Sequence, residues 1–296
     1  MPVDIAFITV NYNTLGCVRQ LTDFFRGLQA PFTFSFTVVD NNSTDGSQEF
    51  LTGVQTIQYI QTGNNIGYGR AINRGVNATD SKYVCVTNTD VILNRDALIA
   101  LWNFMEDQPE AGVCAPRITY ENGRDQGMLF RRSLFSHYAL WFAKASARYW
   151  KQKIANSSGP VRVDGVMGAF FFIRRSVMPS ATLFDEDFFF FHEDTALAHT
   201  LKNRNVACFV LPRTSVIHIG GKSTSQASVP LFYESKYLYL EKFYGRVHAN
   251  AVEFIDRARV LRKWLWYSLF SQFTASERIK SKQRFYKMAW HAARSR

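Results

Sequence analysis

Residues 83–90 read YVCVTNTD, an apolar run that ends directly in polar side chains. The run predicts a buried strand whose carboxyl end delivers the carboxylate of Asp90. Residues 36–42, FTVVDNN, have the same form and carry Asp40 at the corresponding point. Because ligands of open α/β sheets bind at the carboxyl ends of strands, both acids should lie at one binding edge. The pattern predicts a site for a polar ligand that is linked to a metal ion.

Strand-like and helix-like segments alternate along the chain. Apolar runs that predict strands occupy 5–10, 34–39, 57–60, 83–86, 113–119, 166–174, 208–211 and 215–218. Helix-like segments occupy 15–29, 70–78, 95–107 and 193–203. The turn residues 43–47 open a further helix-like stretch. The alternation predicts βαβ units and a parallel sheet. Residues 130–158 predict a helical, aromatic insertion, and helices follow from about residue 230.

Composition limits the class of protein. The 296 residues, 47% of them hydrophobic, are enough for one large domain or for one domain with an appendage. Four scattered cysteines without a Cys-x-x-Cys pair indicate a reducing compartment, with no disulfide framework and no zinc site. No basic segment precedes the first strand, so no signal peptide is predicted. No apolar run reaches the ~18 residues that span a bilayer.

Positive charge is concentrated at the C-terminal end. The net charge is +11, and residues 257–296 hold eleven Lys or Arg against one acid, Glu277, so the remainder is close to neutral. Aromatic residues mix with basic ones at 260–270. Basic amphipathic helices with Trp and Phe bind anionic membrane interfaces. Aromatic packing on the rest of the chain, with the charges as a solvated face, is the alternative. Nucleic-acid binding is not expected.

Five motifs, taken in order, resemble those of the family 2 glycosyltransferases of GT-A fold. They are ITVNYN at 8–13, VVDNNSTDGS at 38–47, NNIGYGRAINRG at 64–75, NTD at 88–90 and the pair Glu193-Asp194. The VDNNS signature is similar to that of bacterial rhamnosyltransferase-type enzymes of polysaccharide assembly. Over residues 3–222 the resemblance implies an α/β, Rossmann-like fold, with a mostly parallel central sheet flanked by helices and a helical, basic C-terminal extension.

The resemblance also implies a division of the chain and an activity. The catalytic domain would span 1–225, with a nucleotide-binding half at 1–110 and an acceptor half at 111–225, before the helical region at 226–296. The enzyme would be an inverting hexosyltransferase that moves a sugar, such as rhamnose, from dTDP-rhamnose or a UDP-sugar to a saccharide. Acceptors in this class are often polyprenyl-linked, which implies a cytoplasmic protein at the inner face of the bacterial plasma membrane.

Asp90 is the expected ligand of a divalent metal, Mg²⁺ or Mn²⁺, which neutralises charge on a leaving nucleotide diphosphate. Such hard cations often take only one or two carboxylates in addition to phosphate oxygens. Asn88 replaces the first acid of the usual Asp-x-Asp and brings no charge. By resemblance His218 is an additional metal ligand, and a strand-end histidine bonded to the backbone is the alternative.

The resemblance assigns nucleotide binding to residues at the strand ends and in the glycine loop. They are Thr9, Val10, Asn11, Tyr12, Asp40, Asn41, Gly67, Arg70, Asn73, Asn88 and Thr89. Asp40 would bind the base or ribose, although an Asx turn would also explain this acid. The glycines of residues 63–75 could alternatively serve only a tight turn.

Asp194 is the expected base that takes the proton of the acceptor hydroxyl, with Glu193 as the alternative. Acids at a helix start are also favoured by capping and by the helix dipole. The cleft for donor sugar and acceptor would be lined by Met167, Gly168, Ala169 and His192, where close backbone packing is the alternative for the small residues.

Two other functions use related features. A sugar nucleotidyltransferase also combines a doubly wound sheet with a metal-binding acid, but it needs a basic, glycine-rich loop after the first strand. Residues 11–15, NYNTL, are not such a loop. A membrane-associated scaffold with a degenerate site is the non-enzymatic alternative.

Overall fold

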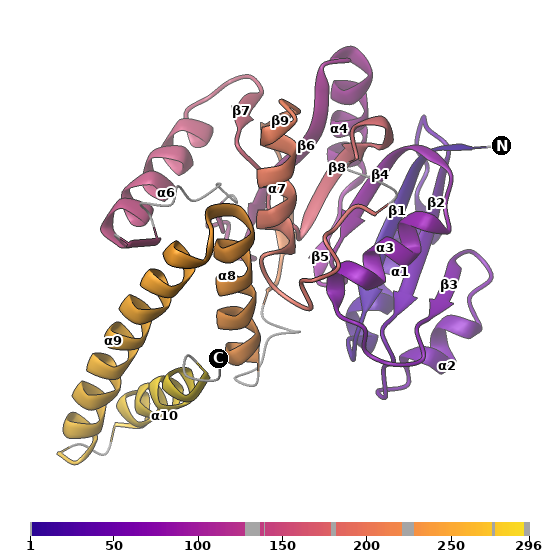
Figure 1. The fold of residues 1–296 in the computed structure, drawn as a ribbon. Helices are drawn as coiled ribbons and strands as arrows, with labels where there is room; N and C mark the ends of the chain where they lie inside the picture. Colours follow the sequence, from indigo (N-terminus) through magenta and orange to yellow (C-terminus); the bar gives the residue numbers. More distant parts are fainter. Residues whose placement is uncertain are drawn as a thin grey trace. The chain divides into compact units, whose positions relative to one another are not determined.

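A computed structural model describes residues 2–127, 137–138, 140–178, 182–220, 228–273 and 276–292. The chain divides into two compact units (Figure 1). The first unit comprises 1–131, 143–189 and 193–223, and the second comprises 132–142, 190–192 and 224–296.

The N-terminal half of the first unit is a parallel α/β layer. Its strands are β1 (Val3–Asn11), β2 (Phe34–Asp40), β3 (Gln58–Gln61) and β4 (Ser81–Thr87). Its helices are α1 (Leu15–Gly27), α2 (Ser47–Thr52), α3 (Tyr68–Asn77) and α4 (Arg95–Asp107). The strands pair in the order β3-β2-β1-β4, all parallel, as the alternation predicts. Asn11 pairs with Asp40, so the two strands end level at one edge.

The remainder of the sheet is mixed, which the sequence pattern did not predict. Strand β8 (Phe170–Arg174) lies antiparallel between β4 and β6 (Ala111–Thr119). Strand β9 (Ala207–His218) runs parallel to β6, and β5 (Val91–Ile92) and β7 (Val161–Val163) run antiparallel to β9. Residues 170–173 are buried on both faces of the sheet. Such a run is apolar in either orientation, so composition does not reveal the strand direction.

Several element boundaries differ from the sequence predictions. Residues 208–211 and 215–218 belong to one strand, β9, whose register against β6 shifts between Leu211 and Ser215. Residues 166–169 lie outside β8, and β7 was not predicted. The predicted insertion contains helix α6 (Leu140–Ala155), while residues 130–136 and 139 of it lie outside the described residues. A 3₁₀ turn, η1 (Arg175–Val177), and helix α7 (Glu193–Asn203) complete the unit.

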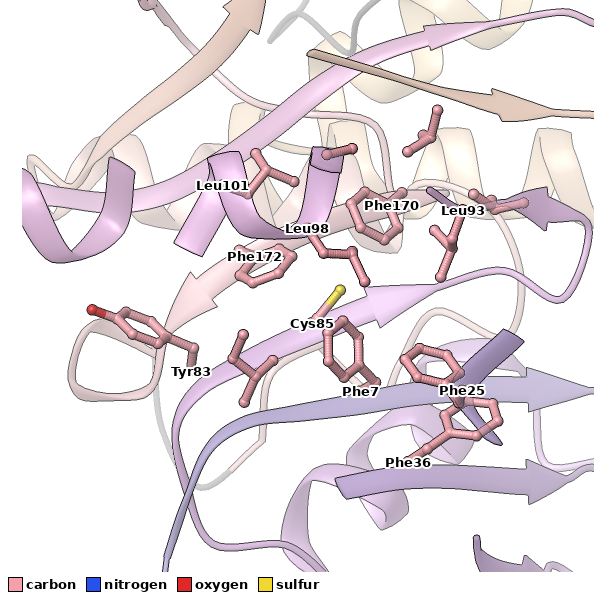
Figure 2. Close-up of a cluster of buried hydrophobic side chains, with 14 of the residues drawn as sticks. Phe7, Phe25, Phe36, Tyr83, Cys85, Leu93, Leu98, Leu101, Phe170 and Phe172 are labelled. Carbon is pink, nitrogen blue, oxygen red and sulfur yellow. The ribbon is translucent and has the colours of Figure 1, made fainter. Parts of the chain in front are cut away.

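An aromatic core fills one face of the sheet. Helix α1 places Val18, Leu21 and Phe25 on one side, where Phe25 stacks on Phe36 with ring centroids 4.1 Å apart. Phe7 meets Phe172 edge to face at 5.9 Å, and Figure 2 shows these rings beside Cys85. Burial of each such side chain stabilises the fold by roughly 1.5–3 kcal/mol. This core fixes the strands whose ends carry the site.

The second unit is helical, as expected for the C-terminal region. Its helices are α8 (Val229–Tyr244), α9 (Arg246–Ser271) and α10 (Glu277–Ala292). Tyr237, Tyr239 and Leu240 are buried, and Lys236 Nζ donates to Asp256 in the interior. Among the described residues, no helix combines the length and the apolar character that crossing a bilayer requires.

Candidate active site

Asp90 and His218 come together at the carboxyl end of β4. Strand β5 follows Asp90 directly and pairs with the end of β9, so that Val91 faces His218. His218 Nε2 lies 3.2 Å from Asp90 Oδ1, and Asp90 is only 6% exposed. Burial raises the pKa of Asp90, but His218 and the backbone N–H groups of Asp90 and Gly220 outweigh it, so the pKa is lowered overall. Asp90 is therefore a carboxylate at neutral pH.

Asp90 and His218 are the side chains that could hold a divalent metal. Elsewhere in the described ranges, as here, no three His, Cys, Asp or Glu side chains gather to share an ion. A site with two protein ligands does not suit a structural zinc ion, which takes four. It does suit Mg²⁺ or Mn²⁺ that completes its shell with diphosphate oxygens and water. The donor set thus fits the predicted metal.

Glu193 and Asp194 form a buried acid pair at the start of α7. The backbone N–H of Gly168 donates to Asp194 Oδ2 at 3.0 Å, and Thr195 Oγ1 lies 3.3 Å from Asp194 Oδ1. Glu193 Oε2 is buried without a hydrogen-bond partner. Burial, and then the charge of Asp194, raise the pKa of Glu193 to about 8. Burial also raises the pKa of Asp194.

The acid pair belongs to the same site as Asp90. The chain that holds Asp194 through Gly168 continues to Ala169, whose carbonyl accepts from the Asn88 N–H at 2.9 Å. The Tyr68 hydroxyl donates to Asn88 Oδ1 at 2.9 Å and lies 3.4 Å from the Gly168 carbonyl. The pKa of Tyr68 is raised well above its usual value, first by burial and then by the charges of Glu193, Asp194 and Asp90. The charges of all three acids therefore act on one hydroxyl group.

Gly168 lies close to Asp194, and a side chain there would press on that acid. An added Cβ would lie 3.0 Å from the Cβ and 3.2 Å from the Oδ2 of Asp194. Of the other residues predicted to line the cleft, Ala169 is buried and Met167 is half-buried against the aromatic core. Contact of these residues with a sugar stays a prediction.

Helix α3 holds the segment that leads to the acid pair. Gly67 has φ +89°, and a Cβ there would come within 2.5 Å of the Phe189 carbonyl, which accepts from the Tyr68 N–H. Arg70 Nε donates to the Glu186 carbonyl at 2.9 Å. The side-chain oxygen of Asn73 accepts from the N–H groups of residues 183 and 184, and its NH₂ group donates to residues 184 and 186. Arg70 and Asn73 thus bind protein, and their predicted nucleotide contacts have no direct support here.

The predicted nucleotide side is a dense polar network at the ends of β1 and β2. The fully buried Asp40 accepts from Asn11 Nδ2 at 2.8 Å and from the Ser43 backbone N–H at 3.1 Å. Asn11 Oδ1 accepts from Thr14, whose hydroxyl lies 2.9 Å from that of Thr89. The strand ends predicted to bind nucleotide are therefore linked to the Asp90 turn.

The remaining predicted nucleotide residues differ in exposure. Asn41 is buried and donates to Asn65 at 2.8 Å, and Thr9 is buried with an unpartnered hydroxyl. Val10 is half-buried, whereas Tyr12 is 42% exposed and open to a ligand. A nucleotide role for each of them stays a prediction.

His192 belongs to the second unit, although it directly precedes Glu193 in the chain. Phe191 and His192 both have left-handed backbones, with φ of 68° and 65°. Such conformations cost about 1 kcal/mol or more for residues other than glycine. The His192 ring packs on Phe232 and Tyr239, with centroids 5.3 and 5.9 Å away. Its predicted place in the sugar cleft is not tested by these contacts.

The sequence analysis missed two residues of the site. Tyr68 lies inside the quoted NNIGYGRAINRG motif, but nothing in the motif shows that its hydroxyl reaches Asn88. Gln126 Oε1 lies 2.7 Å from His218 Nδ1, although 92 residues separate them. No local signal marks Gln126, because only the pairing of distant strands brings it to the site.

Two glycosyltransferases have sequences similar to that of this chain. The N-acetylglucosaminyl-diphospho-decaprenol L-rhamnosyltransferase of Mycobacterium tuberculosis is 26% identical over 229 residues, which cover 70% of this chain and 74% of that protein. A low-salt glycan biosynthesis hexosyltransferase of Haloferax volcanii is 22% identical over 209 residues, covering 69% of this chain and 63% of that protein.

The fold has solved relatives as well. A mannosyltransferase from Pyrobaculum calidifontis in complex with GDP-Man and Mn²⁺ superposes with a TM-score of 0.56 and 13% identity, over 99% of this chain and 86% of that one. The sequence model of glycosyl transferase family 2 matches residues 7–179, more than half of the chain. The chain therefore belongs to glycosyl transferase family 2 and is a glycosyltransferase with the GT-A fold.

Proposed function

We propose that this glycosyltransferase is metal-dependent and inverts the anomeric configuration of the transferred sugar. Asp90 and His218 would hold Mg²⁺ or Mn²⁺. When bound, the ion neutralises charge on the departing nucleotide diphosphate. The observation that carries the proposal is that Tyr68 and Gly168 connect the Asp90 turn to the buried acid pair. One site thus offers a cation-binding carboxylate and a separate proton acceptor.

Asp194 is the base in this proposal. Gly168 and Thr195 donate hydrogen bonds to its two oxygens, and these bonds stabilise the carboxylate form. Glu193 has an unpartnered oxygen and the pKa of about 8, so it retains its proton at neutral pH. One acid of the pair is then ionised and the other neutral. Asp194 can accept the acceptor's hydroxyl proton while that oxygen attacks the anomeric carbon.

The donor is proposed to be dTDP-rhamnose, or else a UDP-sugar, and the acceptor a polyprenyl-linked saccharide. The resemblance of the motifs supports this choice, as do the rhamnosyl and decaprenol groups in the name of the mycobacterial relative. The transfer reaction would be a step of bacterial cell-surface polysaccharide synthesis. A sugar nucleotidyltransferase is not favoured, because the family match covers the segment in which its triphosphate loop would lie.

Binding and product chemistry test the proposal. We expect dTDP or UDP to raise the melting temperature more strongly with Mn²⁺ than without it, since ligands stabilise the folded state by mass action. The Asp90→Ala variant should lose the Mn²⁺-dependent increment but keep the fold. The anomeric configuration of the new glycosidic linkage should be opposite to that of the sugar in the donor. Retention of configuration, or metal-independent nucleotide binding, would contradict the proposal.

The C-terminal helices are proposed to dock on an anionic membrane surface. Leu265, Trp266, Leu269 and Phe270 share one face of α9 by their spacing, are 42–60% exposed, and are followed by Phe273 at 79%. Several exposed bases accompany this apolar stripe, namely Arg262, Lys263, Lys282, Arg284 and Lys287. Apolar area and positive charge together favour the interface of anionic lipid. The proposal includes a location at the inner face of the bacterial plasma membrane.

Vesicle sedimentation tests the docking. Wild-type protein should pellet with phosphatidylglycerol-containing vesicles and much less with phosphatidylcholine alone. A Trp266→Ser/Leu269→Ser variant should remain in the supernatant. Tyr149→Ser, which removes an aromatic that is 57% exposed on the first unit, is the control and should pellet normally. Equal pelleting of all three proteins would refute a role for α9.

A further inference from the structure

The side chain of Gln126 contacts His218 twice. Gln126 Oε1 lies 2.7 Å from His218 Nδ1, and Gln126 Nε2 donates to the backbone carbonyl of the same histidine. The second contact fixes the orientation of the amide, because a flipped amide would set two carbonyl oxygens against each other. Gln126 Oε1 must therefore accept a hydrogen bond, and His218 Nδ1 must carry the hydrogen.

This hydrogen bond decides which ring nitrogen faces Asp90. With the proton of Nδ1 bound by Gln126, Nε2 is the nitrogen directed to Asp90 Oδ1 at 3.2 Å. A histidine that ligates a metal through one nitrogen usually donates its other N–H to a protein oxygen. The pair Gln126–His218 has this arrangement.

Hydrogen bonds of the hairpin that follows β6 hold Gln126 in place. Its backbone N–H donates to the Ile118 carbonyl at 2.9 Å. The preceding residue, Asp125, accepts from Arg117 at 2.7 Å, and its carbonyl accepts from Lys151 Nζ at 3.2 Å. Because the hairpin is anchored on β6 and α6, the amide keeps its direction.

We infer that Gln126 is a positioning residue for the cation site: it fixes His218 so that Nε2 is presented, beside Asp90, to a divalent metal. This inference rests on the proposed metal dependence. It adds a residue that no motif of the sequence marks. Gln126 itself touches no cation, and its effect passes entirely through His218.

Mn²⁺ affinity measured by electron paramagnetic resonance of the free ion tests the inference without any turnover. Gln126→Leu should weaken Mn²⁺ binding by roughly 10- to 100-fold, the usual cost of losing such a partner. Gln126→Glu keeps an acceptor for the Nδ1 proton but sets its second oxygen against the His218 carbonyl, so its Mn²⁺ affinity should lie between those of Gln126→Leu and wild type. Gln152→Leu, an exposed glutamine of α6, is the matched control and should have no effect.

A double-mutant cycle separates positioning from a structural effect. If Gln126 acts through His218, adding Gln126→Leu to His218→Ala should weaken Mn²⁺ binding no further than His218→Ala alone. The inference would be overturned if the two substitutions weakened Mn²⁺ binding independently, so that their effects multiplied in the double variant, or if Gln126→Leu bound Mn²⁺ as wild type does. Either result would leave the metal site intact. Unchanged affinity in both Asp90→Ala and His218→Ala would instead refute the proposed metal site, and the inference with it.

Discussion

Two buried acids, Asp40 at the end of β2 and Glu193 at the start of α7, have opposite surroundings. Asp40 is fully buried and accepts hydrogen bonds from Asn11 and Ser43. Glu193 is 8% exposed, yet one of its oxygens has no partner, and Asp194 adds repulsion. A buried carboxylate with its partners stabilises a fold, whereas one without them costs free energy. The hydrogen bonds of Asp40 hold the ends of β1 and β2 together, and the unpartnered oxygen of Glu193 is in keeping with the proposal that the acid pair serves chemistry.

The largest expected effect is a loss of transfer activity when the acid pair is changed. Asp194→Asn removes the proposed proton acceptor without changing its size, so kcat should fall by about a thousandfold, within the range for loss of general base catalysis. The melting temperature should stay close to that of wild type. Steady-state transfer assays and thermal unfolding measure both quantities. Asp107→Asn, at an exposed site, serves as the control, and near-normal turnover in Asp194→Asn would remove Asp194 from the mechanism.

A smaller effect should appear in stability when Asp40 is replaced. Asp40→Ala leaves the buried Ser43 N–H without an acceptor and removes one partner of Asn11. We expect the free energy of unfolding to fall by about 3 kcal/mol, the cost of losing hydrogen bonds to a buried charge. Urea denaturation of this variant and of Asp107→Ala gives the difference. An unfolding midpoint equal to that of wild type would show that Asp40 does not support the scaffold.

A further expected effect is a pH dependence of stability that comes from the acid pair and to which Glu193 contributes. Its pKa rises from 4.5 in the unfolded chain to about 8 in the folded one. Between these values the folded state binds the extra proton, so stability contributed by the protonated group is lost as pH rises toward 8. The neutral variant Glu193→Gln should lack this loss and gain relative stability with increasing pH. Parallel stability curves for variant and wild type from pH 4.5 to 8 would contradict the assignment.

Much of the N-terminal half follows from local pattern. Alternating apolar strands and amphipathic helices predicted its parallel layer, and helix α4 has the predicted bounds. The acids at the ends of β2 and β4 were predicted to lie at the binding edge, because successive parallel strands place their carboxyl ends together. The family assignment was predicted from ordered motifs and is confirmed by the match over residues 7–179. The division into nucleotide and acceptor halves and the individual site roles stay predictions.

Two features of the first unit could not be predicted in the same way. Residues 170–173 are apolar throughout, and only their pairing with β4 and β6 shows that β8 runs antiparallel. Gln126 has no neighbouring motif, and its contact with His218 depends on the hairpin anchored at Arg117. Long-range pairing is set by the packing of whole strands, which no short window of sequence contains.

The sequence by itself determined the parallel layer of the N-terminal half, the acids at the strand ends and the glycosyltransferase family, because periodicity, turn chemistry and short motifs are local properties of the chain. Tertiary structure alone decided that His218 lies 3.2 Å from Asp90 and that Tyr68 joins Asn88 to the acid pair. It also decided that Glu193 is buried with an unpartnered oxygen and a raised pKa. The reason is physical: burial and the approach of distant side chains arise only when the strands have paired, and these two quantities set the charge of each acid.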